Sequence, residues 1–141
     1  MKSKKTWREK LDTVGDWKIV PADGKRKESM LVPTPRMIEL MVQEIPDGAV
    51  TTAHLIRKTL ARRYGAETTC PLCTGIFLRL TAEAAAEAEA AGEQNVSPYW
   101  RVVDQKGKPN AKYPGGIDGQ MMLLEDEWLT CLGRGKRTAH Q

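Results

Sequence analysis

The chain has 141 residues, of which 40% are hydrophobic and 28% are charged. This balance is typical of a folded globular domain and argues against a disordered chain. No apolar run approaches the roughly 20 residues that cross a bilayer, and the basic start of the chain has no apolar stretch behind it. We therefore expect a cytoplasmic protein with no membrane partner and no secretion signal. An odd number of cysteines, 3, argues against a disulfide framework.

The net charge of +4 is unevenly distributed along the chain. Residues 1–36 carry ten lysines and arginines against five acidic residues, and residues 98–141 carry seven against five. Between these regions, residues 81–97 carry four glutamates and no basic residue. Two basic regions around one acidic segment suit a polyanionic partner that binds at a defined face.

Residues 1–33 are predicted to form a basic arm. Within the arm, residues 7–14 have the pattern of a short amphipathic piece, and residues 21–24 (PADG) favour a turn. Trp7 and Trp17 are the expected hydrophobic anchors of this arm.

Two helices with clear boundary signals follow. In the first, residues 35–45, Thr34 is the expected N-cap and Pro35 the first residue, and one face is apolar. That face comprises Met37, Leu40, Met41 and Ile45. The second helix, residues 53–64, has Thr52 as N-cap and Gly65 as C-terminal cap. It is expected to bury Leu55, Ile56 and Leu60 and to expose most of its basic residues.

A third helix is predicted from Cys70-Pro71 onward, with Thr69 as its cap. Its expected inner face comprises Cys73, Ile76, Phe77 and Leu80. The Ala/Glu tract within residues 81–97 has high helix propensity but little to bury, so we interpret it as an acidic, solvated insertion.

The last part of the predicted domain contains the β component. Residues 97–103 end in an extended segment, and residues 104–108 and 113–116 favour turns. A final helix over residues 120–129 is expected to bury Met121, Leu124 and Trp128, and residues 131–141 to form a flexible tail. Two helices joined by a tight turn and followed by a basic β-loop indicate a mainly α fold with a small β wing, a winged helix-turn-helix domain over residues 34–130.

Three ordered segments have a recognisable pattern. Residues 45–52 read IPDGAVTT, residues 98–103 read PYWRVV, and residues 113–116 (YPGG) precede Leu123-Leu124-x-x-Glu127. These segments resemble the Ile-Pro-x-Gly-x-Val-Thr-Thr, Pro-Cys-His-Arg-Val-Val, Tyr-x-Gly-Gly and Leu-Leu-x-x-Glu motifs of the alkylguanine-DNA alkyltransferases, with the same internal spacing. The resemblance covers about residues 33–129, the DNA-binding half of that family, and implies a winged helix-turn-helix fold that binds double-stranded DNA.

The residues at the family's reaction site differ here. The family transfers an alkyl group to a cysteine thiolate, which a histidine activates and a glutamate orients. Tyr99 stands at the cysteine position and Trp100 at the histidine position, and only Glu127 is retained. A phenol with a pKa near ~10 and no adjacent base is a poor nucleophile at neutral pH. We therefore expect no catalytic residue, no cofactor and no enzyme activity, as in the alkyltransferase-like branch, which binds alkylated DNA without repairing it. That branch usually has tryptophan at the cysteine position and keeps the histidine, so the Tyr99-Trp100 pair differs from both branches.

The resemblance also implies a set of DNA contacts. The expected residues are Thr51, Thr52, Arg57, Lys58, Arg62, Arg63, Leu72, Thr74, Arg79, Arg101, Lys106, Lys108 and Lys112. Leu72 occupies the position of the arginine that fills the gap left by a flipped nucleotide, and Ala53 replaces a tyrosine that helps to rotate it. Base flipping costs a few kcal/mol, and these two residues of the family that assist it are replaced here. Binding of DNA is therefore expected whether or not a damaged base is sensed.

Several alternatives remain open from the sequence. The basic residues of helix 53–64 can be a solvated face, and Arg101 can donate to backbone carbonyls instead of phosphates. Tyr99 and Trp100 can fill the former pocket or stack on a base, and Glu127 can satisfy buried donors. The rival function is a protein-interaction or structural module without DNA repair chemistry, with a partner at the acidic insertion. A DNA-binding protein would be nucleoid-associated, and the sequence leaves the oligomeric state unknown.

Cys70 and Cys73 form a C-x-x-C pattern that has three interpretations. A redox pair requires a β-α-β context, which the sequence does not indicate. A zinc site requires two more ligands, and Cys131, His54 and His140 lack diagnostic spacing, so we expect no metal. Core thiols at the start of the third helix are the favoured interpretation, and an enzyme that uses Cys70 or Cys73 in new chemistry is the weakest functional option.

Overall fold

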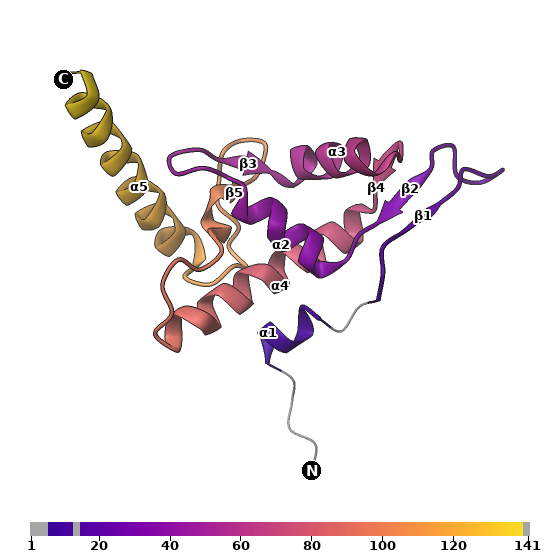
Figure 1. Cartoon of the computed structure of the whole chain (residues 1–141), viewed down its shortest axis with the longest axis horizontal. Helices are drawn as coiled ribbons and strands as arrows, with labels where there is room; N and C mark the ends of the chain where they lie inside the picture. Colours follow the sequence, from indigo (N-terminus) through magenta and orange to yellow (C-terminus); the bar gives the residue numbers. More distant parts are fainter. Residues whose placement is uncertain (1–5, 13–14, 140–141) are drawn as a thin grey trace, which may run out of the picture.

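A computed structural model describes residues 6–12 and 15–139, with the side chains of residues 133–139 left out. The described chain is mostly helical, with two small sheets (Figure 1). Its elements in order are α1 (Trp7–Lys10), β1 (Lys18–Val20), β2 (Met30–Val32), α2 (Pro35–Gln43), β3 (Thr51–Thr52), α3 (Ala53–Tyr64), β4 (Thr68–Thr69), α4 (Pro71–Ala90), the 3-10 turn η1 (Tyr99–Arg101), β5 (Val102–Val103) and α5 (Gly116–Ala139). No helix in the described part of the chain is long and apolar enough to cross a membrane.

The N-terminal region is part of the fold and not a separate arm. β1 and β2 form an antiparallel hairpin, and β2 continues the sheet by pairing in parallel with β4, with Leu31 opposite Thr69. Leu31 is fully buried, so the hairpin contributes to the main core. The predicted turn is present in the connecting loop, where the Asp23 carboxylate accepts hydrogen bonds from the backbone N–H groups of Lys25 and Arg26, each at 2.7 Å. Trp17 contacts the ring of Tyr64 as expected of an anchor, although 45% of its surface stays exposed.

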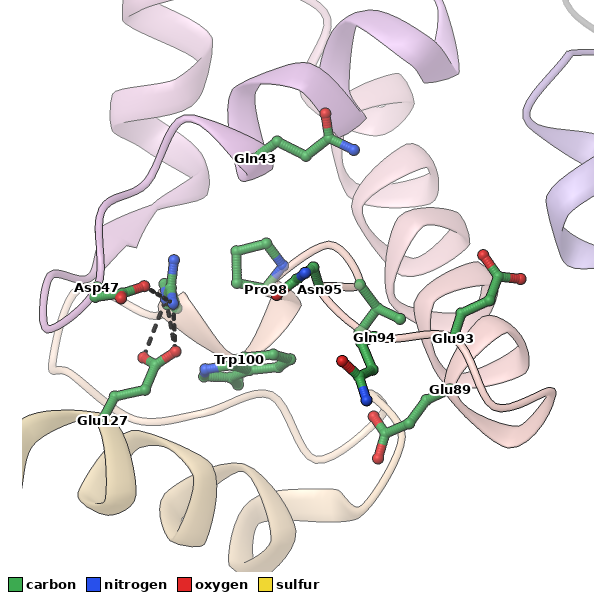
Figure 2. Close-up of a pocket in the computed structure, with 11 residues that line it drawn as sticks. Gln43, Asp47, Glu89, Glu93, Gln94, Asn95, Pro98, Trp100 and Glu127 are labelled. Carbon is green, nitrogen blue, oxygen red and sulfur yellow. Dashed lines mark hydrogen bonds and ion pairs between the residues drawn. The ribbon is translucent and has the colours of Figure 1, made fainter. Parts of the chain in front are cut away.

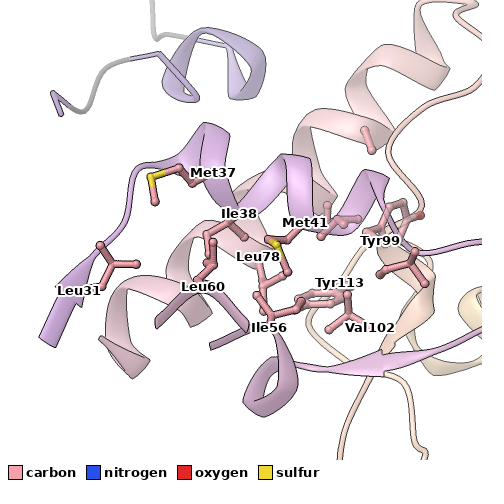
Figure 3. Packing of buried hydrophobic residues seen from close by; sticks show 14 residues of the cluster. Leu31, Met37, Ile38, Met41, Ile56, Leu60, Leu78, Tyr99, Val102 and Tyr113 are labelled. Atoms are coloured by element: carbon pink, nitrogen blue, oxygen red, sulfur yellow. The ribbon is translucent and has the colours of Figure 1, made fainter. Parts of the chain in front are cut away.

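The N-caps of α2 and α3 and both bounds of α3 confirm the sequence prediction, whereas α2 ends at Gln43, two residues before the predicted end. The Thr34 hydroxyl accepts from the backbone of Met37, and the Thr52 hydroxyl accepts from the backbone of Leu55. Gly65 ends α3 with a φ of +79°, in the left-handed region that glycine adopts at lowest cost. Figure 3 shows the core between these helices, in which Ile38 of α2 packs with Ile56, Leu60 and Leu78. Leu40 and Leu55, which were expected inside, are exposed.

Helix α4 corrects two predictions. Its N-cap is Cys70, because Thr69 belongs to β4 and its hydroxyl donates to the Arg57 carbonyl. The buried face of its first half includes Thr74, Leu78 and Leu80, whereas Ile76 is exposed.

The Ala/Glu tract is not a solvated extension. Ala82, Ala84, Ala85 and Ala88 are buried, and α1 packs on this part of α4 through Leu11. The Glu87 carboxylate accepts from the backbone N–H groups at the start of α1, and Arg8 forms an ion pair with Glu93. The acidic segment therefore binds the basic N-terminal region of the same chain. The small alanine side chains permit this close helix contact.

The C-terminal part differs from a regular wing. After β5, residues 104–113 form turns, and no second strand pairs with β5 in the described residues apart from β3. Helix α5 begins at Gly116 and extends to Ala139, through the segment expected to be a flexible tail. Figure 1 shows α5 projecting away from the other helices. Consequently Met121 and Trp128 are exposed and not buried, whereas Gln120 is fully buried.

Candidate nucleic-acid interface

Tyr99 is a core residue. It is 6% exposed, and its hydroxyl donates to the Pro114 carbonyl over 3.5 Å. Its ring makes edge contacts with Trp100 and Tyr113, at centroid distances of 5.2 and 6.4 Å. Burial raises the pKa of Tyr99, and the nearby carboxylates of Glu89 and Glu83 act in the same direction. The phenol is therefore neutral at physiological pH and is not activated as a nucleophile.

Arg101 is the centre of a buried hydrogen-bond network. Its Nε donates to both carboxylate oxygens of Glu127 at 3.0 Å, and its Nη1 donates to the Ile45 carbonyl at 2.6 Å. Its Nη2 donates to Asp47 at 2.6 Å and also to Glu127. With 8% of its surface exposed, Arg101 joins η1 to α5 and to the turn after α2. This is the structural role that the sequence left open, and the engaged guanidinium is not positioned to contact a phosphate.

An acidic cavity lies in front of Trp100 (Figure 2). Its volume is about 650 Å³, and its lining includes the carboxylates of Asp47, Glu89, Glu93 and Glu127. Trp100 is half-buried, and its indole N–H has no hydrogen-bond partner within the described structure. Arg101 pairs with Asp47 and Glu127, and Arg8 pairs with Glu93. Four carboxylates against two arginines leave a net negative charge, which disfavours the entry of a nucleotide phosphate.

The four basic residues predicted on α3 divide into two pairs. Arg57 donates to the Thr69 carbonyl at 3.0 Å, and Arg63 forms an ion pair with Glu44 at 3.1 Å. Lys58 and Arg62 are exposed, and neither forms an ion pair with another described residue. Because they are four residues apart, they lie on one face of the helix.

The predicted DNA contacts on α4 include two exposed residues and one buried residue. Leu72, at the start of the helix, is 71% exposed, and Arg79, near its middle, is also exposed. Thr74 is fully buried, and its hydroxyl donates to the Cys70 carbonyl at 2.8 Å, which removes it from any interface. Thr51 and Thr52 are half-buried in β3, where Thr52 also caps α3.

The three lysines of the predicted wing lie on a loop whose backbone is held by side-chain hydrogen bonds. The Asp104 carboxylate accepts from the backbone N–H groups of Lys106 and Lys108, each at 2.8 Å, and Asn110 accepts from that of Lys112. The backbone N–H of Lys108 is the main reason that the pKa of Asp104 is lowered. All three lysine residues are exposed. The sequence did not show that Asp104 and Asn110 accept hydrogen bonds from the backbone of this loop, although side chains of both types commonly organise turns.

The loop and α3 are neighbours. Asp104, Lys108 and Asn110 line the same depression as Ala53 at the first residue of α3. The other end of α3 contacts Trp17, beside the β1–β2 hairpin. In Figure 1, α3 therefore extends between the loop and the hairpin, far from the C-terminal end of α4.

Comparison of the chain with protein-family models, with curated proteins and with solved structures finds no match. A functional assignment therefore depends on the residues and geometry described above.

Proposed function

We propose that this chain is a non-catalytic protein of the alkyltransferase-like type that binds double-stranded DNA through α3 and the loop of residues 104–112. The observation that carries the proposal is a set of exposed basic side chains that form no ion pair within the described structure: Lys58, Arg62, Lys106, Lys108 and Lys112. The glutamates of the Ala/Glu tract lie in the second half of α4 or directly after it, away from α3 (Figure 1).

The proposed surface predicts a salt-dependent affinity. If each of the five basic residues contacts one phosphate, the logarithm of the binding constant falls with the logarithm of salt concentration with a slope of about −4.5. The first half of α4, with the exposed Leu72 and Arg79, is then available to enter a groove. Arg57, Arg63, Thr74 and Arg101 are outside the proposed surface because the fold already engages their side chains.

Alkyl transfer is not expected. After incubation with an O-alkylguanine duplex, intact-mass spectrometry should give an unchanged protein mass, because Tyr99 is a buried neutral phenol without an adjacent base. A Tyr99→Cys variant should also react slowly, since Trp100 cannot deprotonate the thiol. An alkyl adduct on Tyr99, Cys70 or Cys73 would contradict the non-enzymatic assignment.

A second candidate, self-association, is favoured by the exposed apolar side chains of α5. They are Ile117, Met121, Met122, Trp128, Leu129 and Leu132, with 38 to 67% of their surfaces exposed. Contiguous exposed apolar surface of this kind is typical of a protein contact. Light scattering should then show a mass that rises with protein concentration in the wild type and stays monomeric in Trp128→Lys. A monomeric wild type at every concentration would remove this candidate.

A further inference from the structure

The two cysteines of the C-x-x-C pattern lie between a strand and a helix. β4 ends at Thr69, Cys70 caps α4, Pro71 is the first helical residue, and Cys73 follows in the first turn. β4 also pairs in parallel with β2. A two-residue strand therefore lies directly before the first cysteine, but in the described residues the next strand after α4, β5, belongs to the other sheet, so a β-α-β unit around α4 is not formed.

A backbone hydrogen bond holds the Cys70 thiol at the first turn of α4. The backbone N–H of Cys73 donates to the Cys70 sulfur at 3.4 Å, which holds this sulfur over the first turn of the helix. Residues three apart in a helical turn have Cα atoms about 5 Å from each other, within the range that a disulfide spans. Both cysteines are reduced and half-buried, so neither has the fully buried position expected of a core thiol.

The surroundings give the two thiols different properties. Burial, followed by the hydrogen bond with the Cys70 thiol, raises the pKa of Cys73 to about 11, so Cys73 keeps its proton at neutral pH. At Cys70, a thiolate would accept hydrogen bonds from the Cys73 backbone and lie at the positive end of the α4 dipole. Cys70 is thus the attacking sulfur and Cys73 the resolving one.

We propose that Cys70 and Cys73 form a redox site that undergoes reversible thiol–disulfide exchange with low-molecular-weight disulfides such as glutathione disulfide. The Cys70 thiolate attacks one sulfur of the disulfide, the S–S bond breaks, and one glutathione leaves as a thiolate that takes up a proton. Cys73 then loses its proton and attacks the Cys70 sulfur of the mixed disulfide. The second glutathione leaves, and the protein holds a Cys70–Cys73 disulfide; two electrons have passed to the glutathione.

The third cysteine is an internal control. Cys131 lies on α5 with its sulfur against Gly48, where an added Cβ would come within 2.8 Å of that sulfur. It is half-buried, as Cys70 and Cys73 are, but no neighbouring cysteine follows at helical spacing. A general reactivity of partly exposed thiols would therefore modify Cys131 as readily as Cys70.

The test is a titration of the folded full chain with mixtures of reduced and oxidised glutathione, followed by acid quenching and peptide mass analysis. The peptide with Cys70 and Cys73 should lose two hydrogen atoms in the wild type and in Cys131→Ser, and recover them with excess reduced glutathione. Cys73→Ser should instead accumulate a Cys70–glutathione mixed disulfide. Cys70→Ser, which keeps a good N-cap and therefore the fold, should form neither product.

Two outcomes would overturn the proposal. One is glutathione addition to Cys70 and Cys131 to a similar extent, with no internal disulfide in the wild type. The other is a Cys70–Cys73 disulfide that forms only after denaturation, with circular dichroism as the check that the titrated samples are folded. Neither readout involves DNA, so failure of this proposal is distinguishable from failure of the DNA-binding proposal.

Discussion

An Arg101→Met variant is expected to lose about 3–5 kcal/mol of its free energy of unfolding, because breaking a buried ion pair leaves an uncompensated charge. Methionine retains much of the side-chain length but removes every donor of the network. Glu127, whose side chain is 17% exposed, then keeps its charge without a cation, and the Ile45 carbonyl loses its donor. Urea denaturation at neutral pH measures the change.

Two further variants separate charge from packing at this position. Adding Glu127→Gln to Arg101→Met should recover part of the loss, since the neutral amide is less costly to bury than an unpaired carboxylate. Asp47→Asn should change stability by less than about 1 kcal/mol, because the side chain of Asp47 is 56% exposed and its ion pair is screened by water. An Arg101→Met variant that unfolds like the wild type would contradict the role assigned to the network.

Tyr99→Ala is expected to cost about 3–5 kcal/mol, the usual cost of removing a buried aromatic side chain. Tyr99 is in the core cluster with Tyr113 and Val102, and its loss leaves a cavity. Tyr99→Phe is the matched control and should change stability by less than about 1 kcal/mol, because the hydrogen bond from its hydroxyl to the Pro114 carbonyl is long, at 3.5 Å. Thermal melts of the two variants measure the difference, and similar melting of both would contradict the core assignment.

Trp100→Ala tests the other half of this pair. Trp100 is half-buried and borders the acidic cavity, so we expect a smaller loss of stability than in Tyr99→Ala. If Trp100 stacked on a flipped base, its removal would also weaken DNA binding by about 1–3 kcal/mol. Since the ion pairs of the cavity leave a net negative charge at its lining, we expect no such loss. Unlike the alkyltransferase-like branch, this chain should have equal affinities for plain and alkylated duplexes.

Local signals in the sequence predicted the local structure well. The caps of α2 and α3 were predictable because a threonine side chain at an N-cap and a glycine at a C-cap act on the backbone within a few residues. The burial of the alanines of α4 was not predictable in this way. Ala84 packs with Leu11 at the end of α1, about 70 residues earlier in the chain, whereas Ala82 and Ala85 belong to the main core cluster, which includes residues of α2. The same applies to Leu31, whose burial depends on the pairing of β2 with β4.

The candidate interface was predictable in part for a related reason. The sequence shows where the positive charges are, but not which of them the fold neutralises. Arg57 and Arg63 looked equivalent to Lys58 and Arg62, yet Arg57 contacts the Thr69 carbonyl and Arg63 pairs with Glu44. The resemblance placed Arg101 among the DNA contacts. Its engagement in the fold could not be predicted, because it depends on Glu127 and Asp47, which are distant from it in the sequence.

The central claim is that DNA binds at α3 and the loop of residues 104–112, and one measurement tests it most directly. Fluorescence anisotropy of a labelled duplex, titrated with the full chain from low to physiological salt, gives the salt slope for the wild type and for two double variants of equal charge change. Lys58→Ala/Arg62→Ala removes two charges from the proposed surface, and Lys25→Ala/Lys27→Ala removes two exposed charges from the β1–β2 hairpin. We predict that the first pair makes the slope shallower by about two units and that the second leaves it unchanged. An unchanged slope in the first pair, a change confined to the second pair, or no salt-dependent binding by the wild type would contradict the claim.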